Sequence, residues 1–180
     1  MPIELPMIWI VILNVLLWPV IQVALAWGFT RMPVSCFHPP ASPSFETAAF
    51  YHRFLRIKQW KDLLPDGAKW LGGAFEKREM NATDPAYLNR FIVETWRGEL
   101  CHCCAFLFIP VFFLWNPWWA DCVIFAYVVI ANLPCIIAQR YNRIRLRHLL
   151  ARVNRISGSA RSSWTTSAPL ARPREPNPDP

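Results

Sequence analysis

The chain has 180 residues, of which 54% are hydrophobic and 14% aromatic, and its mean hydropathy is +0.20. Its formal net charge of +7 is compatible with nucleic-acid binding, but the distribution of charge argues against that function. Lysine and arginine are absent before Arg31 and between Arg97 and Arg140. Because basic residues gather in the cytoplasmic loops of membrane proteins, this pattern indicates membrane insertion and no nucleic-acid partner.

The first apolar segment, residues 7–29, contains no charged residue. It is long enough for one helical passage through a hydrocarbon layer about 30 Å thick. The residues before it carry Glu4 and no basic residue, and the apolar run is longer than that of a cleaved signal peptide. The segment is therefore predicted to be an uncleaved membrane anchor.

Two further apolar segments, residues 101–119 and 122–138, follow each other closely. With the first segment they predict an all-α integral membrane protein with about three membrane-embedded helices. An alternative is that the last two form a hairpin that enters the membrane without crossing it. The charge pattern predicts a cell-membrane protein whose N-terminus and turn 116–121 lie outside, and whose basic loop and tail are cytoplasmic.

The basic loop contains two predicted helices. Aromatic and apolar residues recur at helical spacing over 46–64, which predicts a cytoplasmic amphipathic helix lying in the membrane interface. Thr83 or Asp84 is predicted to cap a helix that begins at Pro85 and runs into the second apolar segment.

The third apolar segment is predicted to continue as a basic cytoplasmic helix. Its apolar residues, expected to line the membrane surface, are Leu146, Leu149, Leu150 and Val153. From Ser157 the composition turns to Ser, Pro, Thr and Arg, which predicts a disordered tail over 157–180 and a membrane-embedded domain over 1–156.

Four ionisable residues lie close together at the predicted membrane boundary: Glu94, Arg97, Glu99 and His102. Helical geometry places His102 between the two glutamates in angle, with Glu99 three residues away. A carboxylate beside an imidazole orients a general base and makes it more basic. The pattern predicts a catalytic or substrate-binding site, and the alternative is a purely structural network.

A second polar stretch lies at the end of the third apolar segment. Asn132 and Pro134 predict a kink there. The residues expected to emerge at the level of Glu99 and to bind substrate are Gln139, Arg140, Asn142 and Arg143. Arginine binds phosphate well, so these residues favour a phosphorylated or nucleotide-bearing substrate, whereas the alternative is anchoring to membrane lipids.

Six cysteines, mostly in or beside apolar segments, are expected to be reduced. The run 101–104 contains three cysteines and a histidine, but adjacent ligands on one helix point in different directions, and no second ligand pair has metal spacing. The sequence therefore predicts no metal site and no bound cofactor.

Three stretches carry a family resemblance: RIKQWKDLLPDG (56–67), ETWRGELCHC (94–103) and ANLPCIIAQRYNRIRL (131–146). In this order they resemble the glycosyl-4,4'-diaponeurosporenoate acyltransferase family, and the resemblance extends over about residues 25–150. The resemblance implies esterification of the sugar of a glycosylated carotenoid, or of a related glycolipid, with a fatty acid.

The expected mechanism combines this resemblance with the ionisable cluster. His102, oriented by Glu99, would deprotonate a sugar hydroxyl, which attacks a thioester donor such as acyl-CoA. Arg97, Arg140 and Asn142 would bind the donor head group or the developing oxyanion. Two alternatives remain: a membrane methyltransferase or reductase that depends on a nucleotide cofactor, and a non-enzymatic membrane partner protein.

Overall fold

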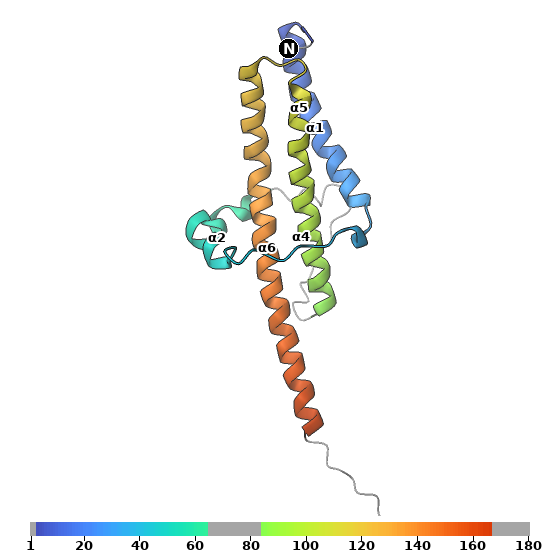
Figure 1. The fold of residues 1–180 in the computed structure, drawn as a ribbon, viewed down its shortest axis with the longest axis vertical. Coiled ribbons are helices and arrows are strands. Elements are labelled where there is room, and N and C mark those ends of the chain that lie inside the picture. Colours follow the sequence, from blue (N-terminus) through green and yellow to red (C-terminus); the bar gives the residue numbers. More distant parts are fainter. Residues whose placement is uncertain (1–2, 65–83, 167–180) are drawn as a thin grey trace, which may run out of the picture.

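The computed structural model describes residues 3–64 and 84–166, which are helical and contain no strand within those ranges (Figure 1). The elements in chain order are α1 (Met7–Arg31), η1 (Val34–Cys36), α2 (Ala48–Leu55), η2 (Ile57–Gln59), η3 (Lys61–Leu63), α4 (Pro85–Ala105), η4 (Phe106–Phe108), α5 (Ile109–Phe112) and α6 (Trp118–Thr166). The predicted all-α class is confirmed for this part of the chain.

Two helices, α1 and α6, are long and apolar enough to cross a membrane. The buried residues of α1 are Ile10, Trp18 and Ile21, which share one stripe, and most of its other large apolar side chains are exposed. A helix that is apolar on every face is suited to a hydrocarbon surrounding. Helix α1 therefore contacts its neighbours along a narrow stripe and presents the rest of its surface outward.

Helices α4 and α6 lie side by side in opposite directions and form the most extensive helix pair (Figure 1). The carboxylate of Asp84 caps α4 by accepting a hydrogen bond from the backbone N–H of Ala86 at 2.9 Å, and Pro85 is the first helical residue. This confirms the predicted helix start, because an N-cap carboxylate and an N1 proline both favour it; Thr83 lies outside the described residues.

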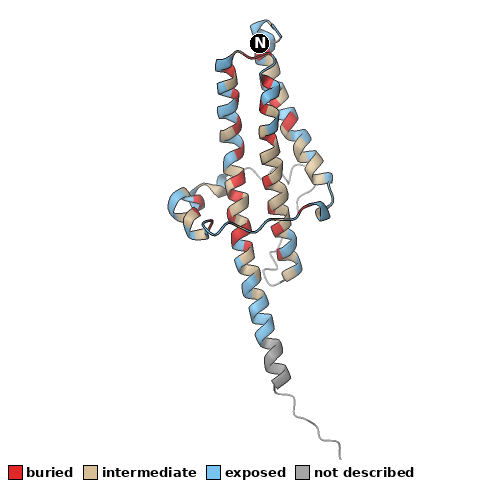
Figure 2. Cartoon of the chain, in the orientation of Figure 1, coloured by how far each residue is buried: buried red, intermediate tan, exposed pale blue. Residues whose placement is uncertain are grey.

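Apolar residues in the second half of α6 pack against α4. Leu146 is buried with Leu88 and Ile92 of α4, and the partly buried residues around them are Tyr87, Phe91, Leu149, Leu150 and Val153. Figure 2 shows buried residues along the facing sides of the two helices, whereas α6 is mainly exposed beyond the start of α4. The predicted surface role is therefore wrong for Leu146, which α4 covers. Leu149, Leu150 and Val153 are only partly buried against α4.

Three helical segments meet at the end of the molecule that carries the N-terminus (Figure 1). Asn14 of α1 donates to Asn116 Oδ1 at 2.9 Å and accepts from Trp115 Nε1 at 3.1 Å, while Ile3 N–H donates to Leu114 O at 3.0 Å. Phe112 and Trp115 pack in the same apolar core as α1. These contacts place the turn 113–117 beside the beginning of α1.

The second apolar segment is not one continuous helix. Helix α4 ends at Ala105, the 3₁₀ turn η4 and the short α5 follow, and the chain leaves helix before Trp118. Pro110 lacks a backbone N–H, and a proline within a helix interrupts the hydrogen-bond ladder. The prediction that residues 101–119 form one membrane-embedded helix is therefore wrong. The segment is divided among the end of α4, η4 and α5, which together lie alongside α6.

The predicted amphipathic helix over 46–64 is wrong in length. Helix α2 begins after Thr47, whose hydroxyl accepts from Phe50 N–H at 3.2 Å, and ends at Leu55. Arg56 adopts a left-handed conformation with φ 45°, and the indole N–H of Trp60 donates to the Leu55 carbonyl at 2.8 Å. The left-handed residue stops the helix, and Trp60 binds a carbonyl freed at its end.

The third apolar segment belongs to a helix that is longer than expected. Helix α6 passes through Pro134 without ending and continues to Thr166. Residues 157–166 are therefore helical where the sequence predicts disorder, and residues 167–180 lie outside the described part of the chain. Because α6 stays helical past Pro134, Arg140 and Arg143 have a fixed position relative to α4.

Candidate active site

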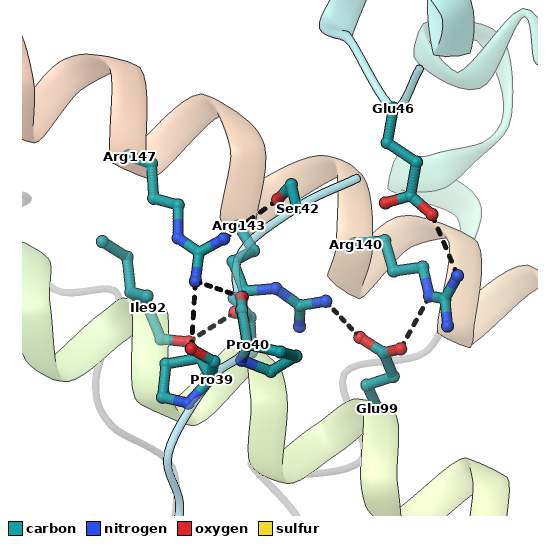
Figure 3. Close-up of polar contacts among 10 residues, drawn as sticks. Pro39, Pro40, Ser42, Glu46, Ile92, Glu99, Arg140, Arg143 and Arg147 are labelled. Atoms are coloured by element: carbon teal, nitrogen blue, oxygen red, sulfur yellow. Dashed lines mark hydrogen bonds and ion pairs between the residues drawn. The ribbon is translucent and has the colours of Figure 1, made fainter. Parts of the chain in front are cut away.

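Two arginines of α6 bind both carboxylate oxygens of Glu99, which projects from α4 (Figure 3). Arg140 Nε donates to Glu99 Oε1 at 2.6 Å, and Arg143 Nη2 lies 2.6 Å from Oε2. Glu99 is 1% exposed and Arg143 is 4% exposed. Burying an ionised carboxylate is costly unless cations and donors compensate it. The two arginines therefore stabilise the charge of Glu99 inside the α4–α6 interface.

The loop before α2 is bound across α6 by arginines of the same helix (Figure 3). Arg140 Nη1 donates to Glu46 Oε1 at 3.0 Å, so this arginine bridges two carboxylates. Arg147 donates to Ser42 Oγ at 2.9 Å and to the carbonyl oxygens of residues 39 and 40 at 3.2 and 2.6 Å. These bonds hold the loop next to Glu99.

Glu94 and Arg97 form a tie between α4 and the segment after α1. Arg97 Nη1 lies 2.9 Å from Glu94 Oε2, and its Nη2 donates to the Met32 carbonyl at 2.9 Å. The guanidinium also lies 4.9 Å from the ring centroid of the buried Phe37. The sequence grouped Glu94 and Arg97 with Glu99, but the structure gives them separate partners.

His102 belongs to a polar network with one residue from each of three helices. Its Nδ1 lies 3.0 Å from Asn132 Oδ1 on α6, and Gln22 Nε2 of α1 donates to the same oxygen at 3.1 Å. Asn132 is 1% exposed, and its Nδ2 donates to the Val128 carbonyl at 2.9 Å. Polar side chains between apolar helices satisfy one another's hydrogen-bonding groups.

This network defines the tautomer of a neutral His102. The bond from Asn132 Nδ2 to the Val128 carbonyl fixes the amide orientation, so that Oδ1 faces His102 and Gln22. An amide oxygen only accepts hydrogen bonds, which assigns the ring proton to Nδ1. The lone pair of His102 Nε2 is then free to accept a proton, as a general base requires.

The predicted orientation of His102 by Glu99 is therefore wrong. Both oxygens of Glu99 bind arginine, and Nδ1 of His102 binds Asn132. Glu99 is buried toward the arginines of α6, whereas His102 lies on the next turn of α4, three residues on. The two side chains lie only about 60° apart around α4, so helical spacing alone allows them to meet. Their separation comes from α6, which offers arginines to Glu99 and Asn132 to His102.

The remaining predicted substrate residues lie near this network in different surroundings. Gln139 is partly buried and lies against Gly98 of α4, where a built Cβ would meet its Nε2 at 3.0 Å. Asn142 is partly buried, and its side chain has no hydrogen bond to any other described residue. Arg143 stacks at 5.1 Å from the Trp96 ring centroid, and its Nε and Nη1 are buried without a described partner.

A tyrosine cluster on the loop side was not predicted. Tyr141 is fully buried, its hydroxyl lies 3.1 Å from His52 Nε2, and its ring packs against Tyr51. Burial, followed by the nearby charge of Glu46, raises the pKa of Tyr51 to about 12. Tyr51 therefore stays protonated at neutral pH and packs α2 onto α6.

No three His, Cys, Asp or Glu side chains within 3–64 and 84–166 gather as a possible metal site. All six cysteines are free thiols. The run 101–104 remains on one helix, where consecutive side chains diverge by about 100°.

The sequence did not single out Gln22, Glu46 or Asn132 as site residues. Gln22 and Asn132 do carry a signal, since each is an isolated amide within a long apolar run. Glu46 carries no comparable signal, because it is one acidic residue in a loop among prolines and serines. Its burial depends on Arg140, which is 94 residues away in the chain.

Comparison with known proteins gives one family. The family model for glycosyl-4,4'-diaponeurosporenoate acyltransferase matches residues 33–152, which include Glu99, His102 and Asn132. A protein of that name from Staphylococcus aureus strain MRSA252 is 31% identical over 138 residues, 74% of this chain and 83% of the relative. Its counterpart from strain USA300 is 30% identical over the same shares. No solved structure matches the chain.

Proposed function

Because the chain belongs to the glycosyl-4,4'-diaponeurosporenoate acyltransferase family, we propose that it transfers a fatty acyl group to a sugar hydroxyl of a membrane-embedded acceptor. The acceptor class is a glycosylated carotenoid or a related glycolipid, in line with the name of the relatives. The donor is an acyl thioester of the acyl-CoA kind, and the chain needs no bound cofactor for the transfer.

The observation that carries this proposal is the bond between His102 and Asn132. With Nδ1–H directed at Asn132, the free Nε2 takes the proton of the sugar hydroxyl. The oxygen attacks the thioester carbonyl carbon, the carbon–sulfur bond breaks, and the leaving thiolate takes the proton from His102. An ester and a free thiol result, and the imidazole returns to its starting form.

The charged network next to His102 suits the polar ends of the substrates. Arg140 has a side chain that is 41% exposed while it binds Glu99 and Glu46, so it is placed to contact a donor head group. Arg143 and Asn142 are proposed as further contacts on the same helix. Three charged residues of α4 have an indirect role, because they hold the substrate-contacting arginines and the neighbouring segments in place. They are Glu94, Arg97 and Glu99.

We further propose three membrane passages, formed by α1, by α4 with η4 and α5, and by the apolar part of α6. The contacts of Asn14 with Asn116 and Trp115 support this arrangement, because they bring the 113–117 turn to the end where α1 begins. In the sequence, all nineteen basic residues fall within 31–97 and 140–174, and we propose that both segments face the cytoplasm of a cell-membrane protein.

The test is acyl transfer by membranes that contain the full chain, with radiolabelled palmitoyl-CoA and extracted glycosylated carotenoids as substrates. We expect a labelled ester with the wild type and a fall of about 10²–10⁴-fold for His102→Ala, the range for loss of a general base. His38→Ala, at an exposed loop histidine, is the matched control. Full transfer by a correctly inserted His102→Ala variant would contradict the assignment of the base.

A further inference from the structure

Gly98 creates a gap between α4 and α6 that is filled by the side chain of Gln139. A Cβ at Gly98 would lie 3.0 Å from Gln139 Nε2 and 3.2 Å from its Cδ, which is closer than ordinary contact. The other described glycines, Gly28 and Gly158, have no neighbouring atom within 4 Å of such a Cβ. A side chain at Gly98 would therefore require the end of the Gln139 side chain to shift by a few tenths of an ångström.

Gln139 lies near His102 in the packing of α4 against α6. The helices α4 and α6 are antiparallel (Figure 1), and Gln139 lies against Gly98, one turn before His102 on α4. Asn132, which binds His102, lies two turns before Gln139 on the same face of α6, so the imidazole and the Gln139 amide both belong to the α4–α6 interface.

The Gln139 amide has donor capacity that the fold does not use. It is partly buried, and it makes no hydrogen bond to another residue of the described chain. The neighbouring residue Arg140 binds Glu99 and Glu46, which fixes α6 next to Gln139. Glu99 follows Gly98 directly, so the same ion pair fixes α4 on the opposite side of the Gln139 amide. A pre-positioned N–H donor without a hydrogen-bond partner among the described residues is suited to an oxygen atom of a ligand.

Resting on the proposed function, we propose that Gln139 is a catalytic residue whose amide N–H donates to the carbonyl oxygen of the acyl donor as that oxygen becomes an oxyanion. His102 Nε2 takes the proton of the acceptor hydroxyl on the same side of Gly98. The amide forms no covalent bond and exchanges no proton, so it only stabilises the negative charge. One interface between two helices then supplies both the base and the oxyanion donor.

The test compares variants that keep the size of the side chain and remove its donor. Gln139→Met retains length and packing, and Gln139→Glu replaces the N–H₂ group with an oxygen. With palmitoyl-CoA and the glycosylated carotenoid extract, we expect kcat to fall about 10²–10³-fold in both variants, as for loss of one oxyanion donor, while KM for either substrate changes little. Gln59→Met, at an exposed position, is the matched control.

Gly98→Ala gives a second, independent readout because it displaces the amide without changing Gln139 itself. We expect a smaller loss of kcat in this variant than in Gln139→Met. The double variant with Gln139→Met should show no further loss beyond that of Gln139→Met alone. If Gln139→Met kept the wild-type kcat, the Gln139 side chain would only fill space, and this result would overturn the proposal. A wild type that transfers no acyl group would instead contradict the proposed function itself.

Discussion

Asn132 binds Nδ1 of His102 at 3.0 Å through the same oxygen that accepts a hydrogen bond from Gln22. The histidine orientation thus depends on an amide, with no carboxylate in direct contact. This relationship distinguishes the structure from a histidine–carboxylate pair, and it leads to a prediction about the pH dependence of the reaction.

Asn132→Asp is expected to move the acidic limb of the rate profile to higher pH. The new carboxylate would favour the protonated imidazole, so a higher pH would be needed to free Nε2 for catalysis. Asn132→Leu, which removes the bond, is expected to lower the rate about 10²-fold through a misplaced ring. The check is kcat against pH for both variants; an unshifted profile in Asn132→Asp would mean that Asn132 does not control the base.

Glu99→Ala is expected to destabilise the protein strongly. Two arginines would lose their shared carboxylate, and Arg143 is buried, so the loss is about 3–5 kcal/mol, the range for breaking a buried ion pair. Thermal unfolding of the detergent-solubilised protein measures this effect. Glu4→Gln, at an exposed residue near the N-terminus, is expected to leave the unfolding temperature unchanged.

Arg147→Met is expected to loosen the loop before α2 without unfolding the helices. The variant loses three hydrogen bonds to residues 39, 40 and 42, while α4 and α6 keep their apolar contacts. Hydrogen–deuterium exchange should therefore increase over residues 37–47 and remain unchanged in α4. Equal exchange in the loop of the wild type and the variant would show that Arg147 does not hold it.

Tyr51 is expected to make stability sensitive to alkaline pH. Its pKa is raised to about 12 in the folded chain against an ordinary value of 10.0, so the folded state favours the protonated phenol. The contribution of this phenol to stability is fully present below pH 10 and is lost as the pH rises toward 12. Unfolding in urea at pH 9 and pH 11.5 should show a smaller decrease for Tyr51→Phe than for the wild type.

The proposed topology predicts opposite accessibility for the two ends of α1. In a variant that keeps only Cys36 and gains Glu4→Cys, a membrane-impermeant thiol reagent should label the new cysteine in intact cells. Cys36, which is exposed after the end of α1, should be labelled only after the membrane is opened. Labelling of Cys36 from outside would reverse the orientation.

The parts of the fold that the sequence predicts are those with local causes. The apolar runs identify α1 and most of α6, and Asp84 with Pro85 marks the start of α4. The ends of α2 and α4 were mistaken because they depend on a left-handed Arg56 and on the interruption near Pro110, which hydropathy does not register. Local patterns thus locate helices more reliably than they locate helix ends.

The sequence predicts which residues belong to the site but not which of them bind one another. Glu99 and His102 lie three residues apart, and angular spacing on one helix suggested that they meet. The partners that compete for them, Arg140 and Asn132, lie on another helix, and their register against α4 depends on side-chain packing across the interface. Pairing within one helix was therefore overridden by tertiary contacts.

Because Gln22 and His102 bind the same oxygen of Asn132, the surroundings of the histidine depend on the packing of three helices. Gln22 belongs to α1, His102 to α4 and Asn132 to α6, so the complete network forms only when all three helices have packed in register. A chain in which α1 has not docked would lack the Gln22 bond, and we expect its activity to be reduced. Full enzymatic turnover should accordingly appear as a late event in biogenesis, and α1 expressed as a separate peptide should restore it to a chain that lacks residues 1–31.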